Sequence, residues 1–257
     1  MEFFVVGLAA FVAAGLTLFS GFGLGTLLLP VFALFFPVNV AVGLTAIVHL
    51  LNNLFKAALL GKHASAKTVV HFGLPAIGAA FAGAGVLVWF SDLQPLASYF
   101  IGNREFHVTP IGLLIALLIM TFAIIELSPY FEKLSFDRKY LPLGGILSGF
   151  FGGLSGHQGA FRSVFLLKCG LSKEAFIATG VVIACFVDVS RLVIYRSRFS
   201  QTIVSENSWL LGIAIIAAFL GVFIGSRLLK KVTMQHIRVG VSILLFGVAI
   251  GLGSGLI

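Results

Sequence analysis

The chain has 257 residues, of which 59% are hydrophobic and 10% are charged, and its formal net charge at pH 7 is +8. Soluble proteins carry about 25% charged residues, so the composition excludes a soluble domain and predicts a polytopic α-helical membrane protein. The basic balance does not indicate nucleic-acid binding, because most cations lie in short loops between apolar runs, where they set membrane orientation. We expect a multi-pass protein of the cell (inner or plasma) membrane, with the lipid bilayer and not a nucleic acid as its partner.

The first apolar stretch, residues 3–36, is too long for one membrane crossing. A single helix of this length would extend about 51 Å, whereas the hydrocarbon core of a bilayer is about 30 Å thick. The glycine-rich sequence at residues 20–25 can interrupt it, which leaves an apolar leg at residues 3–19 and a shorter leg at residues 26–36. The first element is therefore predicted to be a glycine-broken helix pair.

Three continuous apolar spans follow, at residues 38–60, 69–90 and 108–127. Each is close to the roughly 20 residues that a transmembrane helix needs. A short basic loop, residues 61–68, joins the first two spans, and the longest loop, residues 91–107, joins the last two. The first half is thus a broken pair followed by three transmembrane helices.

The second half of the chain repeats this order. A shift of 134 positions superposes three residue pairs without a gap: Gly25 and Gly159, Ala41 and Ala175, Thr45 and Thr179. Internal repetition of this kind is typical of repeat-built transporters. We therefore divide the chain into a first repeat (1–127), a cytoplasmic connector (128–140) and a second repeat (141–257).

The second glycine break, residues 155–163, is polar although apolar segments flank it on both sides. Irregular backbone at membrane depth is tolerated only where it lines a cavity or is buried in protein. If each broken segment enters and leaves the membrane on one face, each repeat has three crossings and the two repeats are inverted. The predicted fold class is thus an all-α polytopic membrane protein of two inverted repeats, each a re-entrant helix pair plus three transmembrane helices.

The placement of cations favours re-entrant over fully spanning broken segments. If residues 61–68 lie on the inner side of the membrane, eleven cations are expected there: Lys62, Lys67, Lys133, Arg138, Lys139, Lys168, Lys173, Arg227, Lys230, Lys231 and Arg238. Those expected outside are Arg104, Arg196 and Arg198. This asymmetry agrees with the positive-inside rule. Fully spanning segments, the alternative that stays open, would place the loops at residues 128–140 and 168–174 on opposite sides.

The first glycine break and the span after it carry a distinctive series of residues: Gly21, Gly23, Gly25, Pro30, Ala41 and Thr45. This series, together with the twofold repetition, resembles the sulfite exporter TauE/SafE family of anion permeases over essentially the whole chain. The resemblance implies transport of sulfur-containing anions such as sulfite, sulfonates and sulfoacetate. The second break departs from the family pattern, since Val164 stands where the first half has Pro30. Because the departure falls on the expected site, we expect it to bear on which anion is carried.

Four ionisable residues lie at predicted membrane depth: Lys56, Arg162, Asp188 and Arg191. A charge at the centre of a transmembrane helix costs about 2.5–3.5 kcal/mol on insertion scales, so such residues are candidates for function. Three cations against one acid leave an excess of positive charge. The membrane interior is therefore predicted to receive an anion.

Arg162 is the strongest substrate-binding candidate, because it lies one turn past the second break. A half-helix that begins at mid-membrane directs N–H groups and a positive dipole end at the cavity, which favours an anion. We expect a bidentate contact from Arg162, although a long side chain of this kind can also reach the membrane interface. The other expected ligands are Gly23, Gly25, Thr26, Ser155, His157, Gln158, Gly159 and Ser163.

A polar stripe follows one face of the span at residues 38–60. It comprises Thr45, His49, Asn52 and Lys56 at helical spacing, with Asn53 alongside, and such a stripe should face a cavity and not lipid. We assign Asn52, Asn53 and Lys56 to substrate binding. His49 is either a proton carrier, since imidazole titrates near neutral pH, or a packed, hydrogen-bonded histidine; Lys56 has interfacial anchoring as its alternative.

Asp188 and Arg191 are three residues apart on a predicted helix and can pair on one face. They form either a structural ion pair or a coupling site in which Asp188 binds a proton and holds Arg191 in place. The remaining histidines show no metal-ligand spacing, so we expect no metal and no cofactor.

These features predict a secondary transporter of small anions that works by alternating access, coupled to protons or to the membrane potential. No Gly-x-x-x-x-Gly-Lys-Ser/Thr phosphate loop is present, so we do not expect ATP to drive transport. An anion channel is the first alternative. A membrane-embedded enzyme is the second, and it is disfavoured because no His–Asp or His–Glu pair is adjacent in the sequence. We expect no catalytic residue, and a homodimer stays open.

Overall fold

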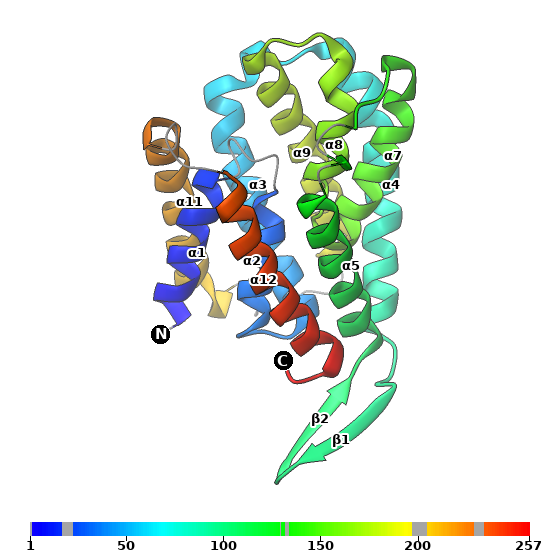
Figure 1. The fold of residues 1–257 in the computed structure, drawn as a ribbon, viewed down its shortest axis with the longest axis vertical. Helices are drawn as coiled ribbons and strands as arrows, with labels where there is room; N and C mark the ends of the chain where they lie inside the picture. The colour runs from blue at the N-terminus through cyan, green and yellow to red at the C-terminus, as the bar shows by residue number, and fades with distance from the viewer. Residues whose placement is uncertain (1, 17–22, 129, 132–133, 197–204, 229–233) are drawn as a thin grey trace.

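The computed structural model describes residues 2–16, 23–128, 130–131, 134–196, 205–228 and 234–257 (Figure 1). The helices of the first half are α1 (Glu2–Leu16), α2 (Leu24–Ala33), α3 (Val38–Leu60), α4 (Ala66–Ser91) and α5 (Pro110–Leu127). Those of the second half are α7 (Leu141–Ser155), α8 (Gly159–Leu166), α9 (Lys173–Tyr195), α11 (Ser208–Leu228) and α12 (Met234–Ser254). Three short 3₁₀ turns lie between helices: η1 (Gly61–His63), η2 (Arg138–Tyr140) and η3 (Leu167–Cys169).

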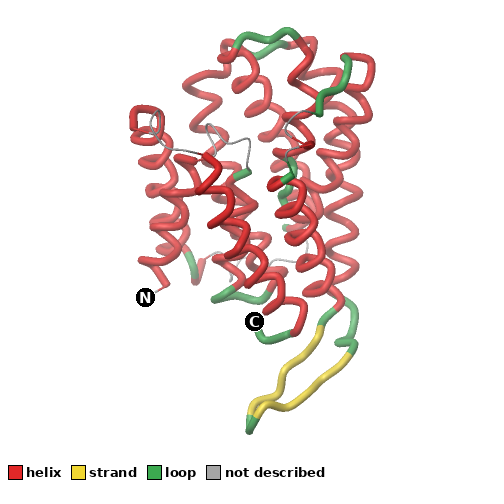
Figure 2. The backbone as a smooth tube through the Cα atoms, in the orientation of Figure 1, coloured by secondary structure: helices red, strands yellow, loops and turns green. Residues whose placement is uncertain are grey.

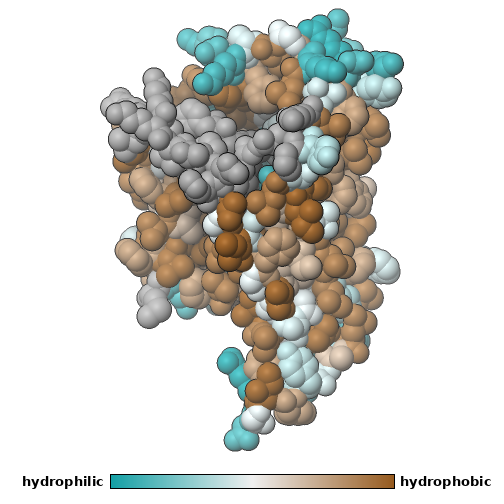
Figure 3. Space-filling model, viewed as in Figure 1, coloured by the Kyte–Doolittle hydropathy of each residue, from teal (hydrophilic) through white to brown (hydrophobic). Residues whose placement is uncertain are grey.

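Five of the described helical segments are long and apolar enough to cross a membrane: Val38–His63, Ala66–Ser91, Pro110–Leu127, Lys173–Tyr195 and Ser208–Gly225. Shorter apolar helices occur at Glu2–Leu16, Leu24–Ala33 and Val239–Ser254. In the space-filling view, hydrophobic residues cover the middle of the molecule and hydrophilic ones gather at its two ends (Figure 3). The prediction of a largely helical, polytopic membrane protein is confirmed.

The expectation of an all-α fold with a loop at residues 91–107 needs one correction. Strands β1 (Ala97–Ile101) and β2 (Arg104–Val108) pair in an antiparallel hairpin that projects from one end of the helices (Figure 1). Gly102, at φ +61°, occupies the turn, where a left-handed conformation favours glycine. Gly-Asn between two runs rich in aromatic and β-branched residues is a hairpin signal, and it was present in the sequence.

Side-chain caps explain where three of the helices begin. The hydroxyl of Ser65 accepts from the Thr68 N–H at the start of α4, and Thr109 and Ser172 cap α5 and α9 in the same way. Such caps satisfy N–H groups that have no partner within the helix. Pro110 follows Thr109 at the first position of α5, where its missing N–H costs nothing.

Helices α4 and α7 pack at very short range through a glycine stripe on α7. A Cβ atom at Gly145, Gly149 or Gly153 would overlap a backbone carbonyl oxygen of α4. Helices α1 and α11 are packed similarly, since a Cβ at Gly221 would overlap the Phe11 carbonyl oxygen. Small residues four apart allow such close approach between membrane helices. Each tight pair joins one helix of the first half to one of the second.

The centre of the bundle is formed by α3 and α9, which pack against each other. Both have 23 residues, and both follow a short helix that begins at a glycine break. Helices α5 and α12 likewise pack together. The two halves therefore share one element order and contribute equivalent helices to a common centre, where the polar residues are found.

Candidate functional site

The second glycine break separates α7 from α8. Gly156 ends α7 with φ +85°, a left-handed conformation that glycine adopts without strain. Residues 156–158 are not helical, and α8 begins at Gly159. Loop segments lie within the height of the bundle as well as at its ends (Figure 2). The chain thus interrupts its helix in the buried interior, as the glycine pattern predicted.

The first break has an equivalent end at α2, which starts at Leu24 with Gly23 as its N-cap. An ideal Cβ at Gly25 would lie 3.3 Å from the Gly156 carbonyl oxygen, and one at Gly23 would lie 3.8 Å from it. The backbones of the two breaks are therefore in contact. Gly21 and the rest of residues 17–22, part of the predicted glycine motif, lie outside the described residues.

Asp188 on α9 is the centre of a buried hydrogen-bond network. Its Oδ2 atom lies 2.6 Å from His49 Nδ1 and accepts from Asn53 Nδ2 at 3.1 Å. Its Oδ1 atom accepts from Gln158 Nε2 at 3.2 Å, and from Nε and Nη2 of Arg191 at 3.1 and 2.7 Å. The carboxylate thus connects α3, the second break and α9.

The predicted ion pair between Asp188 and Arg191 is confirmed, and both side chains are fully buried. The pair between Asp188 and His49 was not predicted, because the two residues are 139 positions apart in the chain. It forms because α3 and α9 pack side by side at the centre. The signal that could have indicated it is the position of both residues near the middle of repeat-equivalent helices.

The polar stripe on α3 is buried inside the bundle and does not lie on its outer surface, and the cavity that it was expected to face stays a prediction. Thr45, His49, Asn52, Asn53 and Lys56 are each 5% exposed or less, so Lys56 does not lie at an exposed membrane interface. The Asn52 amide oxygen and nitrogen have no hydrogen-bond partner among the described residues, and neither does Thr45 Oγ1. These atoms are available to a polar ligand at the centre of the bundle.

Arg162 lies on the first turn of α8 and is only partly buried. Its Nη1 atom donates to Gln158 Oε1 at 3.1 Å, so Gln158 joins Arg162 to Asp188. The side chain passes over Gly180 of α9, where an ideal Cβ would lie 3.2 Å from Nε. The guanidinium is therefore held against the central helix and its amide neighbour.

The other predicted ligands differ in how they are held. His157 Nδ1 lies 2.9 Å from Ser155 Oγ, and its ring stacks on Phe122 with centroids 4.7 Å apart. Ser163 Oγ donates to the Gly159 carbonyl, which turns this hydroxyl back onto its own helix. Thr26 is buried beside the first break.

No group of three or more His, Cys, Asp or Glu side chains that could hold a metal ion occurs among the residues described. The cations at the centre are instead Lys56, Arg162 and Arg191, of which Arg191 pairs with Asp188 directly and Arg162 is joined to it through Gln158. Two breaks in contact and an excess of basic side chains form a region of positive potential, because helix N-termini add partial positive charge.

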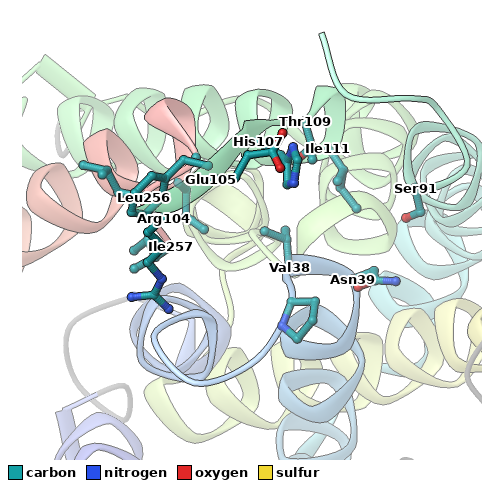
Figure 4. A pocket seen from close by; sticks show the side chains of 14 residues that line it. Val38, Asn39, Ser91, Arg104, Glu105, His107, Thr109, Ile111, Leu256 and Ile257 are labelled. Carbon is teal, nitrogen blue, oxygen red and sulfur yellow. The ribbon is translucent and has the colours of Figure 1, made fainter. Parts of the chain in front are cut away.

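A separate pocket of about 480 Å³ lies under the hairpin. Its polar lining comprises Asn39, Ser91, Arg104, Glu105, His107 and Thr109, and Figure 4 shows these side chains around it. The sequence did not indicate this pocket, because it depends on the unpredicted hairpin. It lies at the end of α3 opposite to η1, so it is distinct from the buried network.

A protein-family model described as "Sulfite exporter TauE/SafE" matches residues 5–252. The match spans both glycine breaks and every helix that contributes to the buried network. No curated protein and no solved structure matches the chain. The resemblance drawn from the glycine motifs is confirmed.

Proposed function

The chain belongs to the sulfite exporter TauE/SafE family of membrane transporters, and from that membership we propose that it is a secondary transporter of a small sulfur-containing anion. The sulfite, sulfonate or sulfoacetate type of anion fits best. Transport would proceed by alternating access about the two glycine breaks and would be coupled to protons or to the membrane potential.

The contact between the two breaks is the observation that carries this proposal. Gly25 lies in the first turn of α2, Gly156 ends α7 just before α8, and their backbones meet in the buried interior. The first N–H groups of a helix have no partner within the helix, and the helix dipole is positive at that end. An anion between α2 and α8 would interact favourably with both ends, and Arg162 would neutralise it from the side.

The inverted arrangement of the repeats belongs to the same proposal. Arg138, just before α7, donates to the carbonyl of Cys169, just after α8. The chain therefore enters and leaves the α7–α8 pair at the same end of the bundle. Pro37 and Val38, which follow α2, line the pocket under the hairpin at the opposite end. These contacts support two re-entrant pairs that enter from opposite faces.

The distribution of charge supports a cytoplasmic position for the end away from the hairpin. Six cations at that end are exposed: Lys62, Lys67, Arg138, Lys139, Lys168 and Lys173. Arg104 and Arg196 lie at the hairpin end. Positively charged loops remain preferentially on the cytoplasmic side of a membrane, so the pocket under the hairpin would open to the outside.

Coupling is assigned to the pair of His49 and Asp188. The pair joins α3 to α9, so a change in its protonation would alter the contact between helices of the two halves. Alternating access in repeat-built transporters is largely the movement of one such unit against another. Proton binding at this pair and anion binding at the breaks would then act on the same interface.

Purified protein in proteoliposomes tests the proposal. Wild-type protein should accumulate labelled sulfite or a sulfonate against its concentration gradient when a proton gradient or potential is imposed. Arg162→Ala should lose at least nine-tenths of this flux while remaining folded, and Lys168→Ala, an exposed cation, should not. Wild-type flux in Arg162→Ala would refute the role of Arg162, and flux that only equilibrates the anion would indicate a channel.

A further inference from the structure

Arg191 has one guanidinium nitrogen that the network at Asp188 does not use. Its Nε and Nη2 atoms both donate to Asp188 Oδ1, whereas Nη1 has no hydrogen-bond partner among the described residues. The side chain is completely buried. A buried donor on a charged group without a partner is costly, and such an atom in a native protein calls for an explanation.

The unpaired nitrogen points at the second break. An ideal Cβ at Gly156 would lie 2.8 Å from Arg191 Nη1, so any side chain there would displace the guanidinium. The left-handed φ of Gly156 independently requires glycine. The close approach of Arg191 and the left-handed φ thus both require glycine at position 156, and the backbone of Gly156 also contacts Gly25 of the first break.

A second unpaired atom lies next to Gly156 in the chain. His157 is 2% exposed, and its Nε2 atom has no hydrogen-bond partner among the residues that the structure describes. Its ring cannot turn freely, because Nδ1 bonds to Ser155 and the face stacks on Phe122. The break therefore has an arginine nitrogen and an imidazole nitrogen, both buried and both held in place.

We propose that Arg191 Nη1 and His157 Nε2 contact the transported anion, so that Arg191 is a primary substrate ligand and not only the partner of Asp188. This assignment rests on the proposed transport function and deepens it. Asp188 then acts as a positioning residue, since it fixes Nε and Nη2 of the guanidinium and leaves Nη1 free to bind. The occupant is a compact oxyanion with acceptor oxygens on more than one side, such as sulfite or sulfate.

The geometry also separates the roles of the two arginines. Arg162 Nη1 already donates to Gln158 and the side chain is partly exposed, so Arg162 suits attraction of the anion toward the break. Arg191 is buried, two of its nitrogens bond to Asp188, and its Nη1 has no hydrogen-bond partner in the part of the chain that the structure describes, which suits selection of the anion. Loss of Arg162 should therefore slow transport of all anions alike, whereas changes at Arg191 should alter which anion binds.

The test uses the unfolding temperature and titration calorimetry of purified full-length protein with sulfite, sulfate and, as a carboxylate control, acetate. Arg191→Gln alone would leave Asp188 without its cation, so it is combined with Asp188→Asn, which keeps two neutral hydrogen-bonding groups. The double variant should fold and lose at least tenfold in affinity for sulfite or sulfate. Lys168→Gln, at an exposed cytoplasmic loop, should bind as wild type does.

Wild-type affinity in the folded double variant would overturn the assignment, because the pair would then be purely structural. If the double variant does not accumulate, Arg191→Lys decides, since lysine can preserve the ion pair but cannot offer three nitrogens. If Arg191→Lys unfolds at the wild-type temperature but binds sulfite or sulfate at least tenfold more weakly, the proposal is supported. If it binds them with wild-type affinity, the proposal is overturned. Absence of any anion effect on wild-type protein would instead contradict the proposed function itself.

Discussion

His49 Nδ1 lies 2.6 Å from Asp188 Oδ2, although 139 positions separate the two residues in the chain. The contact links α3 of the first half to α9 of the second, and Asn53 strengthens it through a second bond to the same oxygen. A buried His–carboxylate pair between two halves of a transporter is well placed to respond to a proton.

Replacement of His49 by glutamine should uncouple transport from protons. Glutamine can still donate to Asp188 but does not titrate, so uptake driven by a proton gradient should fall at least tenfold. Exchange of labelled for unlabelled anion, which needs no net proton movement, should persist. The measurement is the ratio of gradient-driven uptake to exchange in proteoliposomes.

The matched control is His71→Gln, since His71 is exposed and its Nδ1 lies 2.7 Å from the Lys67 carbonyl oxygen on its own helix. It should leave the ratio unchanged. Proton-driven uptake by His49→Gln at the wild-type rate would show that the coupling site lies elsewhere.

Gly156→Ala should lower the unfolding temperature and abolish anion binding. A left-handed conformation costs a residue with a side chain about 1–2 kcal/mol, and the new Cβ would also collide with Arg191. Differential scanning fluorimetry and calorimetry measure the two effects. Gly78→Ala on α4 is the control, because no atom lies within 4 Å of a Cβ there; equal behaviour of the two variants would contradict the account of Gly156.

Gly149→Ala should prevent the chain from accumulating as a folded, monodisperse protein. The added methyl would overlap the Ala76 carbonyl oxygen and force α4 and α7 apart, and overpacking of this kind is destabilising. Size-exclusion chromatography of detergent extracts provides the measurement. Gly85→Ala, which faces open space on α4, should elute as wild type does, and a normal profile for Gly149→Ala would mean that the helices can separate at little cost.

Single cysteines should report opposite sides of the membrane for the two ends of the bundle. In a background with Cys169 and Cys185 replaced by alanine, Arg104→Cys should react with an impermeant maleimide in intact cells. Lys139→Cys should react only after the membrane is opened. Reaction of both variants in intact cells would contradict a membrane crossing by α5, which separates the two positions, and the reverse pattern would contradict the proposed orientation.

Much of the fold could be predicted because the signals are local. Apolar run length and glycine clusters indicated the breaks that now separate α7 from α8 and precede α2. The helical spacing of His49, Asn52 and Lys56 correctly predicted one buried face. The glycine stripe at Gly145 and Gly149 was equally visible in the sequence, yet only its packing against α4 revealed its meaning.

The centre of the site was harder to predict, because it depends on helices far apart in the chain. Gln158 was expected to be a ligand of the anion, which stays a prediction, whereas the bridge that its side chain forms between Asp188 and Arg162 was not expected. That contact requires the second break to lie against α9. The pocket under the hairpin was missed for a similar reason, since strand pairing brings Arg104 and His107 over the end of α3.

The tight packing of α4 against α7, and of α1 against α11, also affects the order in which the protein can assemble. When the ribosome has completed α4, the helix whose glycines fit it has not yet been synthesised, because α7 comes 50 residues later (Ser91 to Leu141). Likewise α1 is synthesised long before its tight partner α11, which begins at Ser208. The first half of the chain cannot complete its packing before the second half has been synthesised. Assembly of this protein is therefore a late event that needs nearly the whole chain.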